Sequence, residues 1–284
     1  MKRRKTIVNL APANIRKEGS AYDLAIAMGI LAATEQIAYE YLQDFIFMGE
    51  LSLDGSLRPI RGALPMAIQA RKESFKGIIL PKANAREAAI VSDLEVYGAD
   101  NISEAIRILN KDKSIEPIQI DTRELFAKAK NDYELDIADV KGQFNIKRAM
   151  EIAAAGGHNM ILIGPPGAGK TMLAKRLPSI LPTLSLREAL ETTKIHSVAG
   201  KLPNNFGLLS NRPFRSPHHT TSDVAMVGGG SKPSPGEISL SHNGVLFLDE
   251  LPEFKRSVLE VLRQPMEAGE VTISRARFSV DYPA

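Results

Sequence analysis

Apolar and polar residues alternate along the first part of the chain in short runs that fit strands and helices in turn. Apolar runs of strand length are separated by stretches with helical periodicity. We expect strands at 6–10, 45–51, 57–60, 77–81 and 94–98, and helices at 21–34, 63–73, 83–91 and 103–110. The Asp-Gly-Ser turn at 54–56 predicts a hairpin between two of these strands. This order is typical of a compact α/β region.

The pattern changes after residue 110, where the chain becomes charged and irregular, with one amphipathic helix expected at 122–130. Beyond it we expect a helix at 143–155, a strand at 159–163, a glycine-rich loop, a helix at 169–177 and a strand at 245–248. The stretch 201–244 is rich in Gly, Pro, Ser and Asn, which favours a long irregular insertion. We therefore predict a first domain at 1–112, a linker at 113–136 and a second domain at 137–284.

Composition narrows the class of protein without naming a function. The chain has 284 residues, of which 44% are apolar and 24% charged, as expected for a globular protein with two domains. Lysine and arginine (36) exceed aspartate and glutamate (33) by three, which is too few to indicate nucleic-acid binding. The chain has no cysteine, so it has no disulfide and no thiolate metal site.

No segment has the pattern of a membrane anchor or an export signal. The apolar stretch 24–33 is about half the ~20 residues that a spanning helix needs. The basic start at 1–5 is followed by interrupting polar residues and a proline rather than an apolar core. We predict a cytoplasmic protein that does not enter a membrane.

The sequence at 164–171, Gly-Pro-Pro-Gly-Ala-Gly-Lys-Thr, has the spacing of a phosphate-binding loop between a strand and a helix. Glycines let the backbone approach phosphates, and the start of the helix favours negative charge. A glycine-rich turn that ends in Lys-Thr by chance is the alternative, and the flanking strand and helix speak against it. The expected contacts with ATP are Gly164, Pro165, Pro166, Gly167, Ala168, Gly169, Lys170, Thr171, Met172 and Asp249.

A second motif supplies the carboxylates that this chemistry requires. The apolar residues 245–248 are followed by Asp249 and Glu250, as at the end of a buried parallel strand. We expect Thr171 and Asp249 to bind Mg²⁺, Lys170 to neutralise the phosphates, and Glu250 to act as general base for an attacking water. Acidic residues also end ordinary strands, so this interpretation depends on the neighbouring phosphate loop.

Further sequence blocks resemble one family. They are Asp139–Gln143, Ile195–Gly200, Arg212–His219, Gly228–Gly230, Pro235–Leu240 and His242–Gly244. Together with the two motifs, they make residues 136–284 similar to magnesium-chelatase-like (ChlI-type) AAA+ ATPases, and the whole chain resembles the ComM/YifB branch. The resemblance implies a P-loop NTPase (AAA+) core with a parallel sheet, binding of ATP and Mg²⁺, and a homo-hexamer that acts on single-stranded or branched DNA.

The first domain resembles the Lon-protease-like domain of the same family, which has a ribosomal S5 domain 2-like α+β fold. In Lon proteases a serine and a lysine act together. Here Ser20 lies in a stretch that lacks the family's proline, and the related stretch 61–66 has no lysine. Ser20 thus has no evident partner base, and we expect this domain to be a scaffold or a partner surface.

The C-terminal stretch predicts a hairpin. Residues 271–274 and 278–280 alternate like strands, and the resemblance implies a presensor hairpin that faces a pore, with 228–244 as the helix-2 insertion. Arg275 and Arg277 would then contact DNA phosphates, and two solvated arginines are the equally open alternative. His218 and His219 are adjacent, so a structural role is favoured over a shared metal ion.

Three functions remain open on the sequence. The first is a ComM-like, helicase-like DNA motor for branch migration in DNA uptake and recombination. The second is a chelatase-type ATPase that remodels a protein partner during metal insertion into a porphyrin. The third is an ATP-binding module without turnover. We expect the chain to be incomplete relative to the family at both ends, lacking the sensor residues and the arginine finger.

Overall fold

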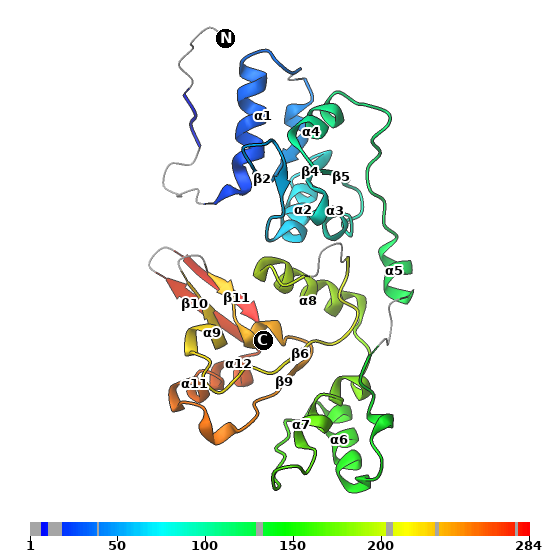
Figure 1. Ribbon diagram of the computed structural model, residues 1–284, viewed down its shortest axis with the longest axis vertical. Helices are drawn as coiled ribbons and strands as arrows, with labels where there is room; N and C mark the ends of the chain where they lie inside the picture. Colours follow the sequence, from blue (N-terminus) through cyan, green and yellow to red (C-terminus); the bar gives the residue numbers. More distant parts are fainter. Residues whose placement is uncertain are drawn as a thin grey trace. The chain divides into compact units, whose positions relative to one another are not determined.

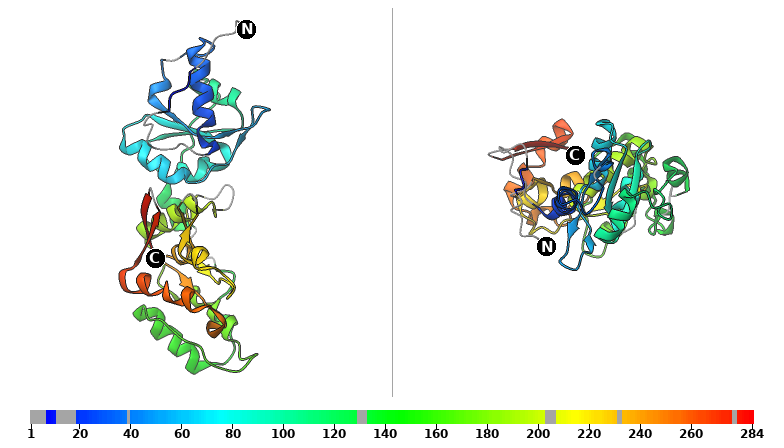
Figure 2. Two further views of the ribbon diagram at one scale, coloured as in Figure 1. Left: turned by 90° about the vertical axis from the view of Figure 1, so that its left-hand side faces the viewer. Right: turned by 90° about the horizontal axis from the view of Figure 1, so that it is seen from above.

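The structure is a computed structural model, and it describes residues 7–10, 19–38, 40–128, 133–202, 207–230, 233–275 and 278–284. The chain divides into two compact units. The first contains Met1–Asp121 and Gly200–Gly207, and the second contains Thr122–Ala199 and Leu208–Ala284. Figures 1 and 2 show the helices and strands of each unit.

The first unit is built on a three-stranded parallel sheet. Its strands are β1 (Phe45–Phe47), β4 (Gly77–Pro81) and β5 (Glu95–Ala99), in the order β1-β4-β5. Every residue of β4 is buried. A continuous apolar run is what a parallel strand with both faces covered requires, and α1 and α4 cover one face while α2 and α3 cover the other (Figures 1 and 2).

The helices of the first unit occupy most of the segments that the periodicity indicates. They are α1 (Asp23–Ala33), α2 (Ala63–Lys72), α3 (Lys82–Ala88) and α4 (Ile102–Leu109), with short 3₁₀ turns at Ser20–Tyr22 and Leu42–Asp44. Leu24, Met28 and Ile79 belong to one buried cluster between α1 and the sheet. The Asn101 side chain accepts a hydrogen bond of 2.9 Å from the Glu104 backbone N–H, which caps the start of α4.

The predicted hairpin is confirmed, but the predicted strand at 45–51 is interrupted. β2 (Glu50–Leu51) pairs antiparallel with β3 (Leu57–Arg58), while Met48 and Gly49 separate β2 from β1. The predicted strand at 6–10 is wrong for its described residues, because 7–10 form no strand. Ile7 and Val8 are 82% and 51% exposed. An alternating strand is stabilised by packing one face against a core, and side chains this exposed are not packed in that way.

The second unit has more of the described helices, and its parallel strands are shorter than those of the first unit. Its helices are α5 (Thr122–Lys128), α6 (Phe144–Gly156), α7 (Lys170–Ala174), α8 (Leu186–Ala199), α9 (Asp223–Val227), α10 (Glu237–Leu240), α11 (Arg256–Glu260) and α12 (Arg263–Ala268), with 3₁₀ turns at Ile137–Asp139, Leu177–Ile180 and Leu251–Glu253. Met226, Ile238, Phe254 and Val258 form a buried cluster together with residues of the C-terminal hairpin. This cluster is the largest apolar core described for the second unit.

Strands pair in three places in the described part of the second unit. β6 (Phe214–Arg215) lies parallel to β9 (Val245–Leu246), β7 (Gly228–Gly229) pairs with β8 (Ser234–Pro235), and β10 (Glu270–Arg275) pairs with β11 (Phe278–Pro283). The predicted C-terminal hairpin is therefore confirmed, and its turn at 276–277 lies outside the described residues. The predicted strand at 245–248 is present but covers only two residues.

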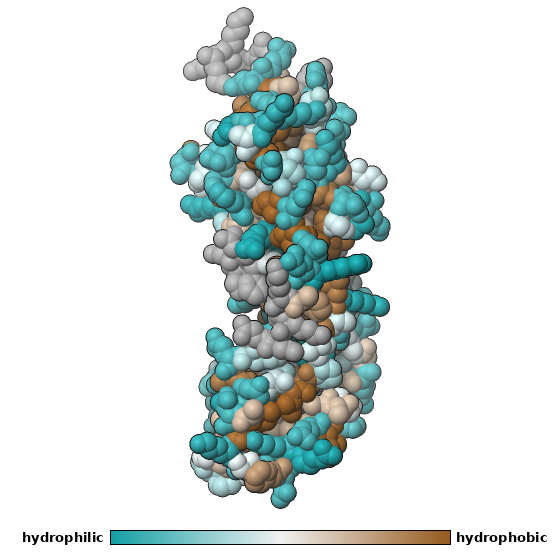
Figure 3. Space-filling model, turned by 90° about the vertical axis from the view of Figure 1, so that its right-hand side faces the viewer, coloured by the Kyte–Doolittle hydropathy of each residue, from teal (hydrophilic) through white to brown (hydrophobic). Residues whose placement is uncertain are grey.

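The predicted strand before the phosphate loop does not form. Residues 159–163 have no assigned strand, and Ile161 and Ile163 are 70% and 88% exposed. The sequence has strand character here, but no described segment pairs with it, and side chains alone do not satisfy an extended backbone. Apolar residues are visible at the surface on the face of the molecule drawn in Figure 3, where they are brown. The following helix is short as well, because α7 ends at Ala174 and Pro178 lies in a 3₁₀ turn.

No helix in the described ranges combines the length and the apolar character needed to cross a bilayer.

Candidate nucleotide-binding site

The loop at 164–171 has the backbone that close approach to phosphates requires. Gly167 and Gly169 adopt positive φ values of 79° and 82°, which glycine reaches without steric cost. A Cβ atom built at Gly167 would meet nothing within 4 Å. Glycine is therefore needed here for the conformation, and open space lies beside the loop where a ligand can enter.

Lys170 folds its side chain back over the loop. Its Nζ donates hydrogen bonds to the carbonyl oxygens of Gly164 at 2.8 Å and Pro165 at 3.0 Å. A phosphate oxygen is a stronger acceptor than a carbonyl because the bond is then charge-assisted at both ends. Since α7 is only five residues long, the lysine and the loop contribute more to anion binding than a helix dipole does.

Thr171 and Asp249 meet although they are 78 residues apart. The Thr171 hydroxyl donates a hydrogen bond of 2.7 Å to Asp249 Oδ2. Thr171 is the second residue of α7, and Asp249 follows β9 by three residues. The structure thus brings together the two residues that sequence analysis assigned to one magnesium ion.

The oxygen donors fit magnesium better than a metal held by protein ligands alone. No group of three or more His, Cys, Asp or Glu residues that could hold a metal occurs among the described residues. Mg²⁺ keeps several waters and usually takes one or two carboxylates plus substrate phosphates. A hydroxyl and a carboxylate beside a phosphate loop are consistent with that preference.

Glu250 has an exposed side chain on an unusual backbone. Its φ of 54° and ψ of 48° lie in the left-handed region, which costs a residue other than glycine about 1–3 kcal/mol. Its N–H donates to Asp249 Oδ1 at 3.1 Å, and its side chain is 67% exposed. The two neighbouring carboxylates therefore have different surroundings. Asp249 accepts a hydrogen bond from Thr171, and Glu250 is largely exposed to solvent.

His219 lies against Glu250, a contact that sequence analysis missed. His219 Nδ1 is 3.4 Å from Glu250 Oε2. β6 and β9 are parallel, with Phe214 opposite Val245, so the segments that follow both strands leave the sheet at the same edge. The Arg212–His219 block was a usable signal, but sequence analysis gave its histidines a structural role.

Charged contacts hold the segment that carries His219. Arg215 binds Glu237 through two hydrogen bonds of 2.7 Å, and Arg212 donates to the carbonyl of Asn243 at 2.6 Å. Bidentate pairs of this kind fix direction as well as distance. The Arg212–His219 segment is therefore anchored to the first residue of α10 and to the chain just after this helix.

His196 is buried beneath the same region. It is 8% exposed, and its Nε2 lies 3.0 Å from the Leu240 carbonyl oxygen. Burial lowers the pKa of His196 below its usual range, and the hydrogen bond to Leu240 opposes this shift. A neutral ring that donates from Nε2 fits this environment.

The structure does not test the predicted DNA contacts. Arg275 ends β10, but its side chain is outside the described part, and Arg277 lies wholly outside it.

In the first unit, Ser20 Oγ donates to a Glu50 carboxylate oxygen. Glu50 is also 3.9 Å from the Arg58 guanidinium. Ser20 thus has a carboxylate partner that sequence analysis did not find, although that carboxylate is shared with an arginine.

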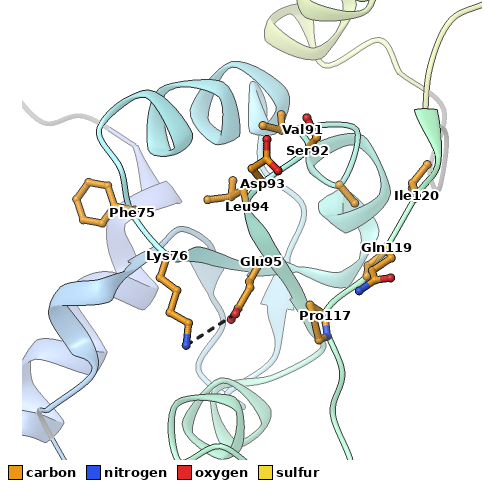
Figure 4. Close-up of a pocket in the computed structure, with 12 residues that line it drawn as sticks. Phe75, Lys76, Val91, Ser92, Asp93, Leu94, Glu95, Pro117, Gln119 and Ile120 are labelled. Carbon is orange, nitrogen blue, oxygen red and sulfur yellow. Dashed lines mark ion pairs between the residues drawn. The ribbon is translucent and has the colours of Figure 1, made fainter. Parts of the chain in front are cut away.

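A cavity of about 560 Å³ lies in the first unit (Figure 4). An ion pair of 3.8 Å joins Lys76 and Glu95 in its wall. Residues 117–120 line one side, where the Ile118 N–H donates to the Val96 carbonyl of β5 at 2.8 Å. None of the residues assigned to ATP or Mg²⁺ lines this cavity.

Comparisons with known proteins show the family of the chain. Residues 136–284 match the family model described as magnesium chelatase, subunit ChlI, and residues 1–84 match a second model described as subunit ChlI of Mg-chelatase. Competence protein ComM of Haemophilus influenzae is 48% identical over 278 residues, which cover 98% of this chain and 54% of that protein. YifB of Escherichia coli is 46% identical over 286 residues, covering 99% of this chain and 54% of that protein.

A more distant relative matches a part of the chain. The archaeal Lon protease of Thermococcus kodakarensis is 30% identical over 99 residues, which cover 34% of this chain and 15% of that protein. The Lon-like similarity is therefore partial.

The loop at 164–171 is joined by a hydrogen bond to Asp249, which follows a strand of a parallel pair. These features define the class of fold, which is a P-loop protein with a parallel sheet. The chain belongs to the magnesium-chelatase-like AAA+ family, and within it to the branch of ComM and YifB. The family and the fold class predicted from the sequence blocks are thereby confirmed. Nearly all of the chain aligns with these curated relatives, and it spans about half of their length.

Proposed function

We propose that the second unit binds Mg²⁺-ATP and that the complete protein hydrolyses it. The observation that carries this proposal is the 2.7 Å hydrogen bond between Thr171 and Asp249, which joins the two motifs at one place. Around it lie the residues proposed to contact the nucleotide: Gly164, Pro165, Pro166, Gly167, Ala168, Gly169, Lys170 and Met172.

Each polar side chain has a distinct role in this proposal. Lys170 compensates the charge of the β- and γ-phosphates, and Thr171 and Asp249 hold Mg²⁺, which would offset the charge that develops on the phosphate oxygens. Glu250 accepts a proton from the attacking water. The water oxygen bonds to the γ-phosphorus as the bond to the bridging oxygen breaks, and ADP leaves.

Lys170→Ala tests nucleotide binding directly. We expect the variant to lose ATP binding, measured by titration calorimetry, because the charge-assisted contacts to the phosphates disappear. Lys175→Ala is a matched control, since Lys175 is an exposed lysine at the end of the same helix. Equal ATP affinity in the wild type and the Lys170 variant would remove the central claim.

Glu250→Gln separates binding from turnover. In the complete protein we expect this variant to bind ATP normally and to lose hydrolysis, because the amide cannot accept the proton of the water. Phosphate release under saturating ATP measures the loss. A variant that hydrolyses ATP at the wild-type rate would exclude Glu250 as the base.

We further propose that the complete protein is a cytoplasmic, homo-hexameric motor that acts on single-stranded or branched DNA. The support is the similarity across the chain to a relative named as a competence protein. Arg275 and Arg277 of the C-terminal hairpin are the proposed phosphate contacts. The complete protein should bind branched DNA and show DNA-stimulated hydrolysis, and failure in both would end this proposal.

A chelatase-type role is the second candidate, because the matched family model is described as a magnesium chelatase subunit. In that role the ATPase would remodel a protein partner. Co-purification with a large porphyrin-binding protein would favour it over the DNA motor. In either case we propose that residues 1–112 form a scaffold domain and that 113–136 link it to the ATPase domain at 137–284.

A further inference from the structure

We propose that His219 is a positioning residue for Glu250: its ring holds the carboxylate in the orientation from which Glu250 takes the proton of the attacking water. The inference rests on the proposed hydrolysis and assigns a function to a residue outside both nucleotide motifs. It starts from the 3.4 Å separation of His219 Nδ1 and Glu250 Oε2.

The His219 ring is fixed by its neighbours. It lies against the His218 ring, with centroids 4.0 Å apart and the planes tilted by 36°, and it meets the Phe254 ring edge-on at 6.5 Å. Phe254 is 5% exposed and belongs to the apolar core of the second unit. The His219 side chain is itself only 30% exposed. A ring held between a second ring and the core is a rigid support for whatever bonds to its edge.

Glu250, by contrast, needs such a support. Its side chain is 67% exposed, and a free glutamate on the surface samples several rotamers. Its left-handed backbone also carries a strain that surrounding contacts must hold in place. The described contacts of its carboxylate include His219, whereas its N–H bonds to Asp249.

A hydrogen bond that forms from this 3.4 Å contact would leave Glu250 competent as a base. In the tautomer with a proton on Nδ1, the ring donates to Oε2, and Oε1 remains free to accept the proton of a water. Proton transfer requires the base within hydrogen-bond reach of the water in one orientation. Loss of the ring should therefore reduce the rate of the chemical step and leave the contacts to the phosphates unchanged.

The test compares His219→Ala and His219→Asn in the complete protein. The side-chain amide of asparagine occupies the place of Nδ1 and can donate the same hydrogen bond. We expect His219→Ala to lower kcat by about 10-fold or more, a part of the ~10²–10⁴-fold that a positioned base contributes, while KM and the Kd for ATP stay within about twofold. His219→Asn should recover most of the rate. His158→Ala, an exposed histidine of the same unit, serves as the control.

A double variant makes the comparison sharper. If His219 acts through Glu250, His219→Ala should have no further effect on kcat in a Glu250→Gln background. A multiplicative loss would overturn the inference, as would a parallel loss of ATP binding in His219→Ala or an asparagine variant as slow as the alanine variant.

The same experiment separates the inference from the proposed function. Hydrolysis by the wild type with an equal kcat for His219→Ala would overturn the role of His219 alone. Absence of hydrolysis in the complete wild-type protein would overturn the proposed function, and the role of His219 with it.

Discussion

The sheets of the two units differ in how they are covered. In the first unit, β4 is buried along its whole length between β1 and β5. In the second, β6 and β9 pair over two residues each, and the apolar segment at 159–163 is exposed. The first sheet is stabilised by burial of apolar side chains, whereas the candidate site is held by specific polar contacts such as Thr171 to Asp249.

The largest expected effect tests this difference with one substitution in two places. Ile79→Ala, in buried β4, should lower the free energy of unfolding of the first unit by about 2–5 kcal/mol, since it leaves a cavity. Ile163→Ala, at a residue that is 88% exposed, should change the second unit by less than about 0.5 kcal/mol. Urea unfolding followed by hydrogen exchange reports on each unit separately. Similar losses at both positions would remove the contrast.

A glycine substitution asks where the second unit is tightly packed instead. A Cβ atom at Gly236 would lie 2.4 Å from the Gly228 nitrogen and 2.4 Å from the Met226 carbonyl oxygen. Gly236→Ala should therefore cost about 1–3 kcal/mol through overpacking. Gly29→Ala is the control in the first unit, because a Cβ there meets nothing within 4 Å, and it should be neutral or slightly stabilising. A neutral Gly236→Ala, measured by thermal unfolding, would show that this loop can rearrange.

The smallest expected effect is a pH dependence confined to the second unit. Because burial lowers the pKa of His196 below 6.5, the folded state binds fewer protons than the unfolded chain as the pH falls through that value. The stability contribution is complete above pH 6.5 and decreases on acidification toward the lower folded pKa. His196→Gln keeps a donor toward Leu240 but does not titrate, so it should lose less stability than the wild type between pH about 7.5 and about 5.5. An identical loss would mean that another group is responsible.

The buried strands and the phosphate loop could be predicted because their sequences carry the information locally. Residues 77–81 form a continuous apolar run, and 164–171 has a motif spacing that few other structures share. The contact between Thr171 and Asp249 could also be predicted, because both residues were expected to bind the same Mg²⁺ ion. The apolar run and the loop motif are each encoded in a short stretch of consecutive residues, and the contact was inferred from two such motifs.

The failures concern features that depend on distant partners. Whether 159–163 pairs is decided by a neighbouring strand, not by its own β-branched and apolar side chains. The contact of His219 with Glu250 depends on the register between β6 and β9, which are two residues long. Periodicity cannot specify the register of strands so short.

The folded-back side chain of Lys170 sets a condition that a ligand of this loop would have to meet. Its ammonium group already has two carbonyl acceptors, Gly164 and Pro165, so the proposed binding of a nucleotide would exchange these partners for phosphate oxygens. Only the difference between the two sets of contacts would contribute to affinity. A ligand whose phosphates reach the lysine would displace the carbonyls, whereas a nucleoside monophosphate that stops short would leave the lysine bound to them.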